Sequence, residues 1–130
     1  LARFVSEDVV LAPSAPAWNP NHDVLRENIR ALRRMRTADS GSLLEVIPLN
    51  SPRPIRPEGW REEILPATYA NFLLINQAVL VPTYRQDFAD SEALAVIAQA
   101  YPDRTVIPID CSDIILEGGA LHCLSQQQPL

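Results

Sequence analysis

The chain has 130 residues, of which 47% are hydrophobic and 21% charged, so it can form one domain with a buried core. Its net charge of −5 argues against nucleic acid as a partner, because phosphate binding requires concentrated Lys and Arg. No apolar run approaches the roughly 20 residues that cross a bilayer, and two cysteines are too few for a disulfide framework or a zinc cage. We therefore expect a cytoplasmic protein with no membrane contact and no metal.

The first half of the chain predicts two strands, a helix and a third strand. Ala2–Val5 and Val9–Pro13 are the first two strands, joined by a tight turn. Asn19-Pro20-Asn21 marks the start of a helix whose apolar residues recur at helical spacing: Val24, Leu25, Ile29, Leu32 and Met35. The one basic cluster of the chain continues along this helix, and we interpret it as a solvated face: Arg30, Arg33, Arg34 and Arg36. Glu45–Asn50 is the third strand.

The same order of elements is predicted again in the second half. Ala70–Leu73 and Val79–Pro82 form the strands, with a turn at Asn76-Gln77. A helix follows, with Asp90 as its expected N-cap and an end near Tyr101-Pro102. Thr105–Asp110 closes this half, and its Val-Ile-Pro core repeats that of the earlier third strand.

This repetition predicts two equivalent α/β units, at about residues 1–50 and 67–110, followed by a segment at 111–130. The proline-rich stretch Ser51–Pro66 connects the units, and loops of this length often act as lids. The chain begins as if cut within a strand. Two units alone leave an open strand edge, so we expect the isolated chain to self-associate or to be marginally stable.

Cys123 is the strongest candidate for chemistry. It follows the paired glycines Gly118 and Gly119, which let the backbone turn sharply or approach a ligand closely. If the segment is extended, the adjacent His122 faces the opposite side and cannot activate the thiol. The other histidine, His22, is better explained as a capping or surface residue at the first helix. The chain thus offers a nucleophile without an evident base.

Several other polar and aromatic residues have both structural and functional interpretations. Asn71, at the repeat position of Arg3, either lies at a strand edge or points to a substrate from the start of a strand. Cys111 is expected to be structural. The remaining candidates are two acids expected to cap a turn and two loop tryptophans that could wall a pocket: Asp110, Asp113, Trp18 and Trp60.

The second half of the chain resembles the agmatine deiminase family, which includes bacterial peptidylarginine deiminases. Gly118 to Pro129, with its His-Cys-Leu-Ser-Gln-Gln-Gln-Pro run, is the most specific matching element. Further matching segments cover the second half almost continuously, and Ala2-Arg3-Phe4 extends the match into the first: Ala67 to Phe72, Val79 to Thr83, Tyr101 to Arg104, and Ile107 to Asp110.

The resemblance implies a five-fold pseudosymmetric α/β propeller, the pentein fold, of which this chain is a C-terminal fragment with about two ββαβ blades. It also implies hydrolysis of a small guanidino substrate without a cofactor, most simply agmatine to N-carbamoylputrescine and ammonia. By this resemblance Cys123 is the nucleophile, which forms a covalent thiouronium intermediate. Asn71, Gly118 and Gly119 are then substrate-binding residues.

Two departures from the family pattern keep alternatives open. The family's Gly-His-x-Asp motif, which holds the general acid/base and a guanidinium ligand, would fall just before Leu1 and is absent from the sequence. Ala120 stands where agmatine deiminases commonly have Asn. The alternatives are therefore a peptidylarginine deiminase, or another enzyme acting on a guanidino group, and a truncated, non-catalytic α/β module.

Overall fold

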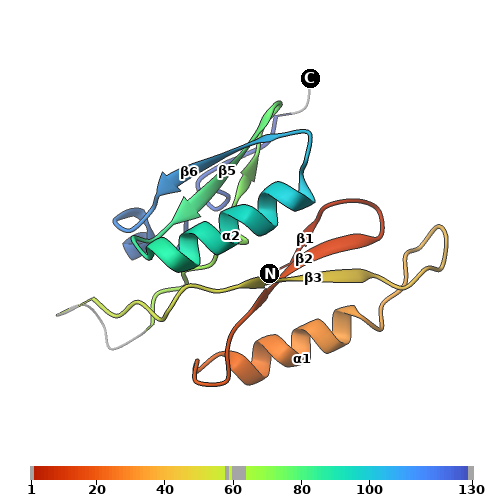
Figure 1. Cartoon of the computed structure of the whole chain (residues 1–130), viewed down its shortest axis with the longest axis horizontal. Helices are drawn as coiled ribbons and strands as arrows, with labels where there is room; N and C mark the ends of the chain where they lie inside the picture. The colour runs from red at the N-terminus through yellow and green to blue at the C-terminus, as the bar shows by residue number, and fades with distance from the viewer. Residues whose placement is uncertain (1, 58, 60–63, 129–130) are drawn as a thin grey trace.

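The computed structural model describes residues 2–57, 59 and 64–128, and it confirms a mixed α/β architecture (Figure 1). The first half contains, in chain order, β1 (Arg3–Phe4), β2 (Val9–Ser14), α1 (His22–Leu32) and β3 (Glu45–Asn50). The second contains β4 (Leu73–Leu74), β5 (Ala78–Thr83), α2 (Asp87–Ala100) and β6 (Thr105–Asp110), followed by a 3₁₀ helix, η1 (Ile114–Glu117). The predicted order of strand, strand, helix, strand is present in both halves.

The two halves have the same sheet topology. β1 is antiparallel to β2 and β2 is parallel to β3, and the same relations join β4, β5 and β6. Parallel neighbours require a crossover connection, which α1 and α2 provide. Each half is therefore one ββαβ unit.

Prolines occupy matching positions in the two sheets. Pro13 and Pro82 are the fifth residues of β2 and β5, whereas Pro48 and Pro108 are the fourth residues of the edge strands β3 and β6. A proline has no N–H to donate and is tolerated where the ladder does not need one. β1 and β4 pair only with two residues of the central strands, so the two central prolines lie beyond their reach.

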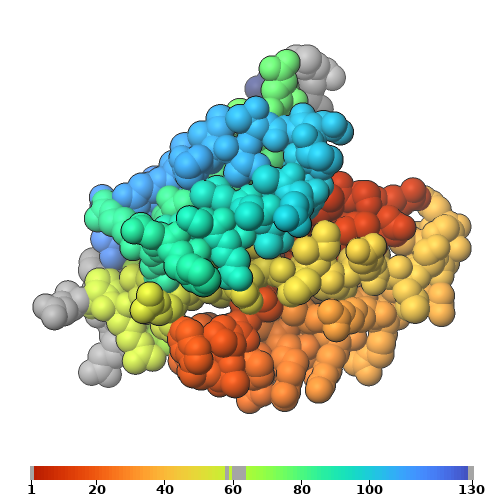
Figure 2. Space-filling view, viewed as in Figure 1, coloured from red at the N-terminus to blue at the C-terminus, as the bar shows by residue number. Residues whose placement is uncertain are grey.

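α2 lies between the two sheets, where it contacts both β3 and β6 (Figure 1). Figure 2 shows its atoms directly against those of β3 on the visible face. β2 is buried on both sides for this reason. Val10 and Ala12 pack with Ile29 of α1, whereas Leu11 joins Ile97 of α2 in the larger core. The two units thus share the larger hydrophobic cluster, whereas the smaller one belongs to the first unit.

The start of α2 differs from the prediction that Asp90 is its N-cap. The helix begins three residues earlier, at Asp87, and Gln86 is the capping residue. Asp90 is buried in the first turn, where its Oδ2 accepts a hydrogen bond from the backbone N–H of Gln86 at 2.9 Å. The carboxylate therefore accepts a hydrogen bond from a free N–H group at the start of the helix, although Asp90 lies within the first turn and not before it.

α1 begins where the Asn-Pro-Asn signal predicts, but its apolar face is only partly covered. Ile29 is buried, whereas Val24 is 56% exposed, and Met35, beyond the helix end, is 51% exposed. The arginines along and after this helix are exposed, as predicted, and Glu27 pairs with Arg30 and Arg34. In the part of the chain that the structure describes, neither helix has the length and apolar character that crossing a membrane requires.

The described part of the connector has no helix or strand. Its Pro52 and Leu65 are buried, and the backbone N–H of Arg53 donates to Oε1 of Gln86 at 2.7 Å. These contacts tie both ends of the connector to the second unit. A role as a lid stays a prediction.

Arg3 joins the first strand to the second unit. Its guanidinium lies 4.6 Å from the ring centroid of Phe72 and donates to the Phe72 backbone oxygen at 3.1 Å. Tyr101, whose ring packs edge-on against Phe72, donates its hydroxyl to the backbone oxygen of Phe4 at 3.0 Å. The segment beside Asn71 is therefore held partly by the other unit.

Replacing Arg3 with Ala is expected to lower the free energy of unfolding by about 1–2 kcal/mol, because it removes a half-buried hydrogen bond and a cation–π contact. Urea denaturation followed by circular dichroism measures this change. Arg26→Ala, which breaks only the exposed pair with Asp23, is the control and is expected to cost at most about 0.5 kcal/mol. Equal losses in the two variants would contradict a link between the units through Arg3.

Candidate active site around Cys123

Cys123 lies in a tight turn that follows β6 and η1. η1 ends at Gly118, whose left-handed backbone (φ 92°) reverses the chain as the paired glycines predict. Residues 121–124 then form a turn, so the conditional expectation of an extended segment is wrong. Ile115 and Ala120 are fully buried on the approach to the turn, whereas Cys123 is exposed. The thiol is thus presented to solvent from a segment anchored in the core.

The side chain of Asn71 holds this turn through three hydrogen bonds, which we call the Asn71 clamp. Its Oδ1 accepts from the backbone N–H groups of His122, at 2.9 Å, and Cys123, at 3.3 Å. Its Nδ2 donates to Sγ of Cys123 at 3.2 Å. Two backbone donors on one side fix the orientation of the amide, since the oxygen must face them.

Asn71 is well placed to act on the thiol because its side chain is buried and hydrogen-bonded. The residue is only 4% exposed. The functional interpretation put Asn71 at the start of a strand, whereas the structure places it before β4. Its backbone oxygen also faces the N–H of His122, at 3.3 Å. The structure therefore brings together Asn71 and Cys123, two predicted site residues that are 52 positions apart in sequence.

Gly119 is in contact with the candidate nucleophile. A Cβ at this position would lie 2.7 Å from Cβ and 3.0 Å from Sγ of Cys123, closer than side chains tolerate. At Gly118 a Cβ would meet nothing within 4 Å, although the left-handed backbone favours glycine. The two glycines thus have different structural roles: Gly118 turns the chain, and Gly119 leaves room for the thiol. Their binding of substrate stays a prediction.

Neither histidine ring makes a hydrogen bond with Cys123 in the described part of the chain. His122 contributes its backbone N–H to the Asn71 clamp, and the half-buried ring of His22 bonds the backbone oxygen of Ala15 at 2.7 Å in the first unit. That the chain itself brings no base to the thiol stays a prediction.

Cys111 and the two acids near it have structural roles. Cys111 is fully buried, and this burial raises the pKa of its thiol. Asp110 accepts from the N–H of Ser112 at 3.0 Å, as expected for a turn cap, and also pairs with Arg85 at 2.8 Å. Asp113 precedes η1 without a side-chain cap and lies 3.5 Å from the same guanidinium.

Trp18, one of the two tryptophans expected to wall a pocket, borders a hollow away from the thiol. Trp18 is 63% exposed and borders a hollow of about 300 Å³ with Phe88 and Glu92, a hollow that Cys123 does not line. Trp60 lies outside the described residues. No group of three or more His, Cys, Asp or Glu side chains within residues 2–57, 59 and 64–128 is placed to hold a metal ion.

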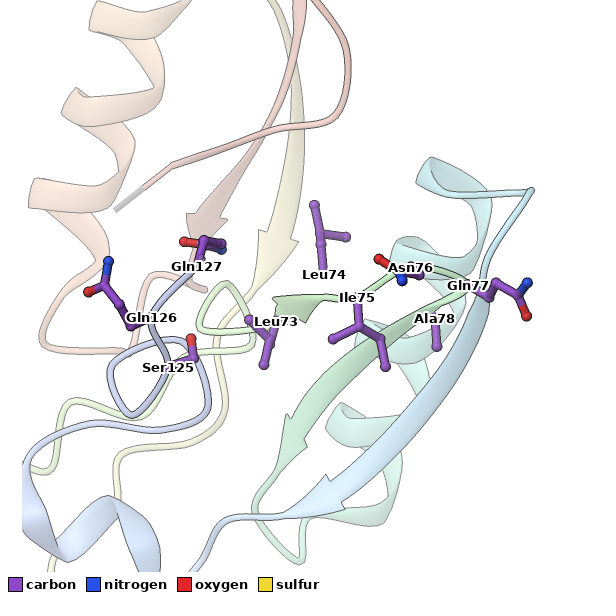
Figure 3. Close-up of a pocket in the computed structure, with 9 residues that line it drawn as sticks. All are labelled: Leu73, Leu74, Ile75, Asn76, Gln77, Ala78, Ser125, Gln126 and Gln127. Carbon is purple, nitrogen blue, oxygen red and sulfur yellow. The ribbon is translucent and has the colours of Figure 1, made fainter. Parts of the chain in front are cut away.

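A larger hollow, of about 640 Å³, lies beside the glutamine run. It is lined by residues 73–78, from the β4–β5 hairpin, and by Ser125, Gln126 and Gln127 (Figure 3). Neither Cys123 nor Asn71 lines it. The hollow borders the segment that carries the thiol but is distinct from the Asn71 clamp.

Sequence reasoning missed the residues that support Asn71. Thr68 and Tyr84 hydrogen-bond each other across 16 positions, and Asp90 accepts from the hydroxyl of Tyr69 at 2.7 Å. No local sequence pattern predicts these hydrogen bonds, because they join a turn, a strand end and a helix start. The sequence signals only that Asp90 stands near a helix start.

The fold and the site together define an α/β protein with an exposed thiol held by a buried amide. The model of the Porphyromonas-type peptidyl-arginine deiminase family matches residues 1–129. The chain therefore belongs to this family, as its motifs suggest.

Individual relatives agree with this membership. An agmatine deiminase from Ectopseudomonas mendocina is 31% identical over 137 residues, with 94% of this chain and 37% of the relative covered. One from Pseudomonas putida is 43% identical over 65 residues, covering 50% of this chain and 17% of the relative. A crystal structure of a Porphyromonas gingivalis protein, provisionally named an arginine deiminase, matches with a TM-score of 0.90 at 37% identity, covering 99% of this chain and 37% of that one. The chain thus spans well under half the length of the proteins it matches.

At pH 8, iodoacetamide is expected to modify Cys123 at least about 10-fold faster than Cys111, because burial both shields the Cys111 thiol and keeps it protonated. Peptide mass spectrometry of the folded chain gives the two rates. Cys123→Ala should remove the fast phase and leave the slow one. Comparable rates for the two thiols in the folded chain would contradict the placement described above.

Gly118→Ala and Gly119→Ala are expected to have different consequences. Gly118→Ala should lower the free energy of unfolding by about 1–2 kcal/mol through backbone strain, with little effect on the alkylation rate of Cys123. Gly119→Ala should change that rate severalfold, because its Cβ displaces the thiol. Denaturation curves and alkylation kinetics on both variants separate the effects. A Gly119→Ala variant with an unaltered Cys123 rate would count against the close contact.

Proposed function

We propose that this chain is part of a guanidine-hydrolysing deiminase in which Cys123 is the nucleophile. The observation that carries the proposal is the Asn71 clamp, which presents an exposed thiol and directs an N–H donor at its sulfur. Membership of a family named for peptidyl-arginine deiminases, with relatives named agmatine deiminases, supports this chemistry. Asn71, Gly118 and Gly119 are the proposed substrate-binding residues.

The proposed reaction has two stages. The thiolate of Cys123 attacks the guanidinium carbon and a C–S bond forms. A C–N bond then breaks as the departing nitrogen takes up one proton from a proton carrier and leaves as ammonia. Water then attacks the thiouronium carbon, the C–S bond breaks, and a ureido product leaves with the thiolate restored. Asn71 contributes a donor beside the sulfur, and Gly119 leaves space for the carbon to approach. No electrons are transferred, so the balance requires only water and proton carriers.

The proton carriers and the carboxylates that grip a guanidinium are proposed to come from outside this chain. A planar guanidinium is best held by carboxylates that bind two N–H groups at once. In the described residues, no acidic side chain hydrogen-bonds within the Asn71 clamp, and neither histidine ring hydrogen-bonds Cys123. The resemblance places a Gly-His-x-Asp motif immediately before the strand that corresponds to β1 (Arg3–Phe4) of this chain.

Agmatine is the preferred substrate, with N-carbamoylputrescine as product and putrescine synthesis as the wider role. The support is the match to curated agmatine deiminases over 94% of this chain. Peptidylarginine is the second candidate. It is favoured by the family model and by Ala120, whose methyl is fully buried and stands where agmatine deiminases commonly carry a polar Asn.

The whole protein is proposed to be a five-fold α/β propeller, to which this chain contributes two units. The identical topology and strand register of the two halves support such a repeat. The coverage of 37% of the length of a relative is close to that expected for two units of five. A cytoplasmic location stays a proposal, consistent with two cysteines that are both free.

The test is ammonia release by the full-length protein that contains this chain, with agmatine and an arginine-containing peptide as separate substrates. Cys123→Ala is expected to abolish release, by at least about 10³-fold, since the covalent step is lost. Cys111→Ala is the matched control and should retain most of the activity, because that thiol is buried away from the site. Full activity of Cys123→Ala would refute the proposal, whereas no activity in the parent protein would favour a non-catalytic module.

The 130-residue chain alone is expected to release no measurable ammonia from agmatine. The reason is that Cys123 has no general acid/base among its described contacts. The same assay at high protein concentration checks this, with the full-length protein as the positive control. Robust release by the short chain would show that it carries a complete active site.

A further inference from the structure

Asn71 stands in the site because a short turn holds it there. The backbone N–H of Asn71 donates to the backbone oxygen of Thr68 at 3.2 Å, and the N–H of Ala70 donates to Oγ1 of Thr68 at 3.2 Å. Thr68 is therefore the residue on which the turn closes. Any group that fixes the backbone of Thr68 also fixes the direction from which the Asn71 amide meets the thiol.

The hydroxyl of Tyr84 is such a group. It accepts a hydrogen bond from the backbone N–H of Thr68 at 3.3 Å and donates to the backbone oxygen of the same residue at 3.1 Å. The Tyr84 side chain is almost fully buried, and this burial raises the pKa of its hydroxyl well above the ordinary value. The hydroxyl thus remains a neutral donor and acceptor over the whole range in which a thiol titrates.

Tyr84 is in turn held by Asp90. The buried carboxylate accepts from the backbone N–H of Tyr84 at 3.1 Å and from the hydroxyl of Tyr69, which belongs to the turn itself, at 2.7 Å. The rings of Tyr69 and Tyr84 pack against each other, with centroids 5.6 Å apart. One carboxylate at the start of α2 therefore fixes the turn from two sides.

We propose that Tyr84 is a positioning residue for the Asn71–Cys123 contact, with Asp90 as its anchor. Tyr84 touches neither the thiol nor the Asn71 side chain by any hydrogen bond in the structure; it acts through the backbone of Thr68. Loss of its hydroxyl leaves the turn without the bonds that hold Thr68, so Nδ2 of Asn71 no longer points reliably at Sγ. The significance of this device for catalysis rests on the proposed function, but its effect on the thiol does not.

The experiment measures the alkylation rate of Cys123 by iodoacetamide between pH 6 and 10, in a Cys111→Ala background that leaves a single thiol. Tyr84→Phe is expected to change the alkylation rate by about 5-fold at the pH where its profile differs most from that of the parent. A factor of this size corresponds to the loss of about one hydrogen bond. The change should have the same direction as that of Asn71→Ala. Tyr101→Phe is the matched control: it removes another core hydroxyl that bonds a backbone oxygen, that of Phe4, and should leave the profile within about 2-fold.

The double variant decides between positioning and a general loss of stability. If Tyr84 acts through Asn71, then Tyr84→Phe produces no further change in an Asn71→Ala background, because the contact it positions is already gone. Additive effects, an unchanged Tyr84→Phe profile, or an equal change in Tyr101→Phe would each overturn the proposal. If Tyr84→Phe does not fold by circular dichroism, Asp90→Asn replaces it in the same cycle, with the same expected dependence on Asn71.

This design separates the inference from the proposed function. The thiol assay requires no deiminase activity and uses the chain as it is. Coupling between Tyr84 and Asn71 in a protein that releases no ammonia would retain the positioning role and remove the enzymatic one. Ammonia release by the full-length protein without such coupling would retain the enzymatic role of the protein and remove the positioning role of Tyr84.

Discussion

The architecture around the thiol depends on one buried amide. Asn71 is the point at which three separate stretches of chain meet: its own turn, the turn that carries Cys123 and, through its neighbour Phe72, the first strand. A buried amide without partners would cost about 1–3 kcal/mol, so the position of Asn71 and the turn that carries Cys123 each depend on the other. The site is consequently a product of tertiary packing rather than of any single motif.

This dependence explains what sequence could and could not predict. β3 and β6 are predicted to the residue, because their β-branched residues and shared Val-Ile-Pro core are typical of a strand. The start of α2 is misplaced, since Asp90 serves the helix from its fourth residue and looks like a cap in sequence. Helical periodicity likewise indicates an apolar face on α1 but not how much of it another element covers.

The candidate site likewise divides into features that the sequence predicts and features that only the structure shows. The motif around Cys123 and the match to Asn71 come from family resemblance, and the structure adds the hydrogen bonds that join them. Thr68 and Tyr84 have no signal in the sequence, because a hydroxyl that bonds a distant backbone leaves no periodic or compositional trace. The turn at residues 121–124 is missed because its direction is set by Gly118 and by Asn71, not by the propensities of its own residues.

The matched prolines in the two sheets bear on how such a repeat avoids wrong strand pairing while it is being synthesised. An unfinished repeat emerging from a ribosome presents bare strand edges, and bare edges recruit other nascent chains. Pro48 and Pro108 each lie in the middle of an edge strand, where the ring removes a donor and its bulk obstructs a partner. A proline at the same register in both units thus disfavours pairing of each edge strand with a wrong neighbour.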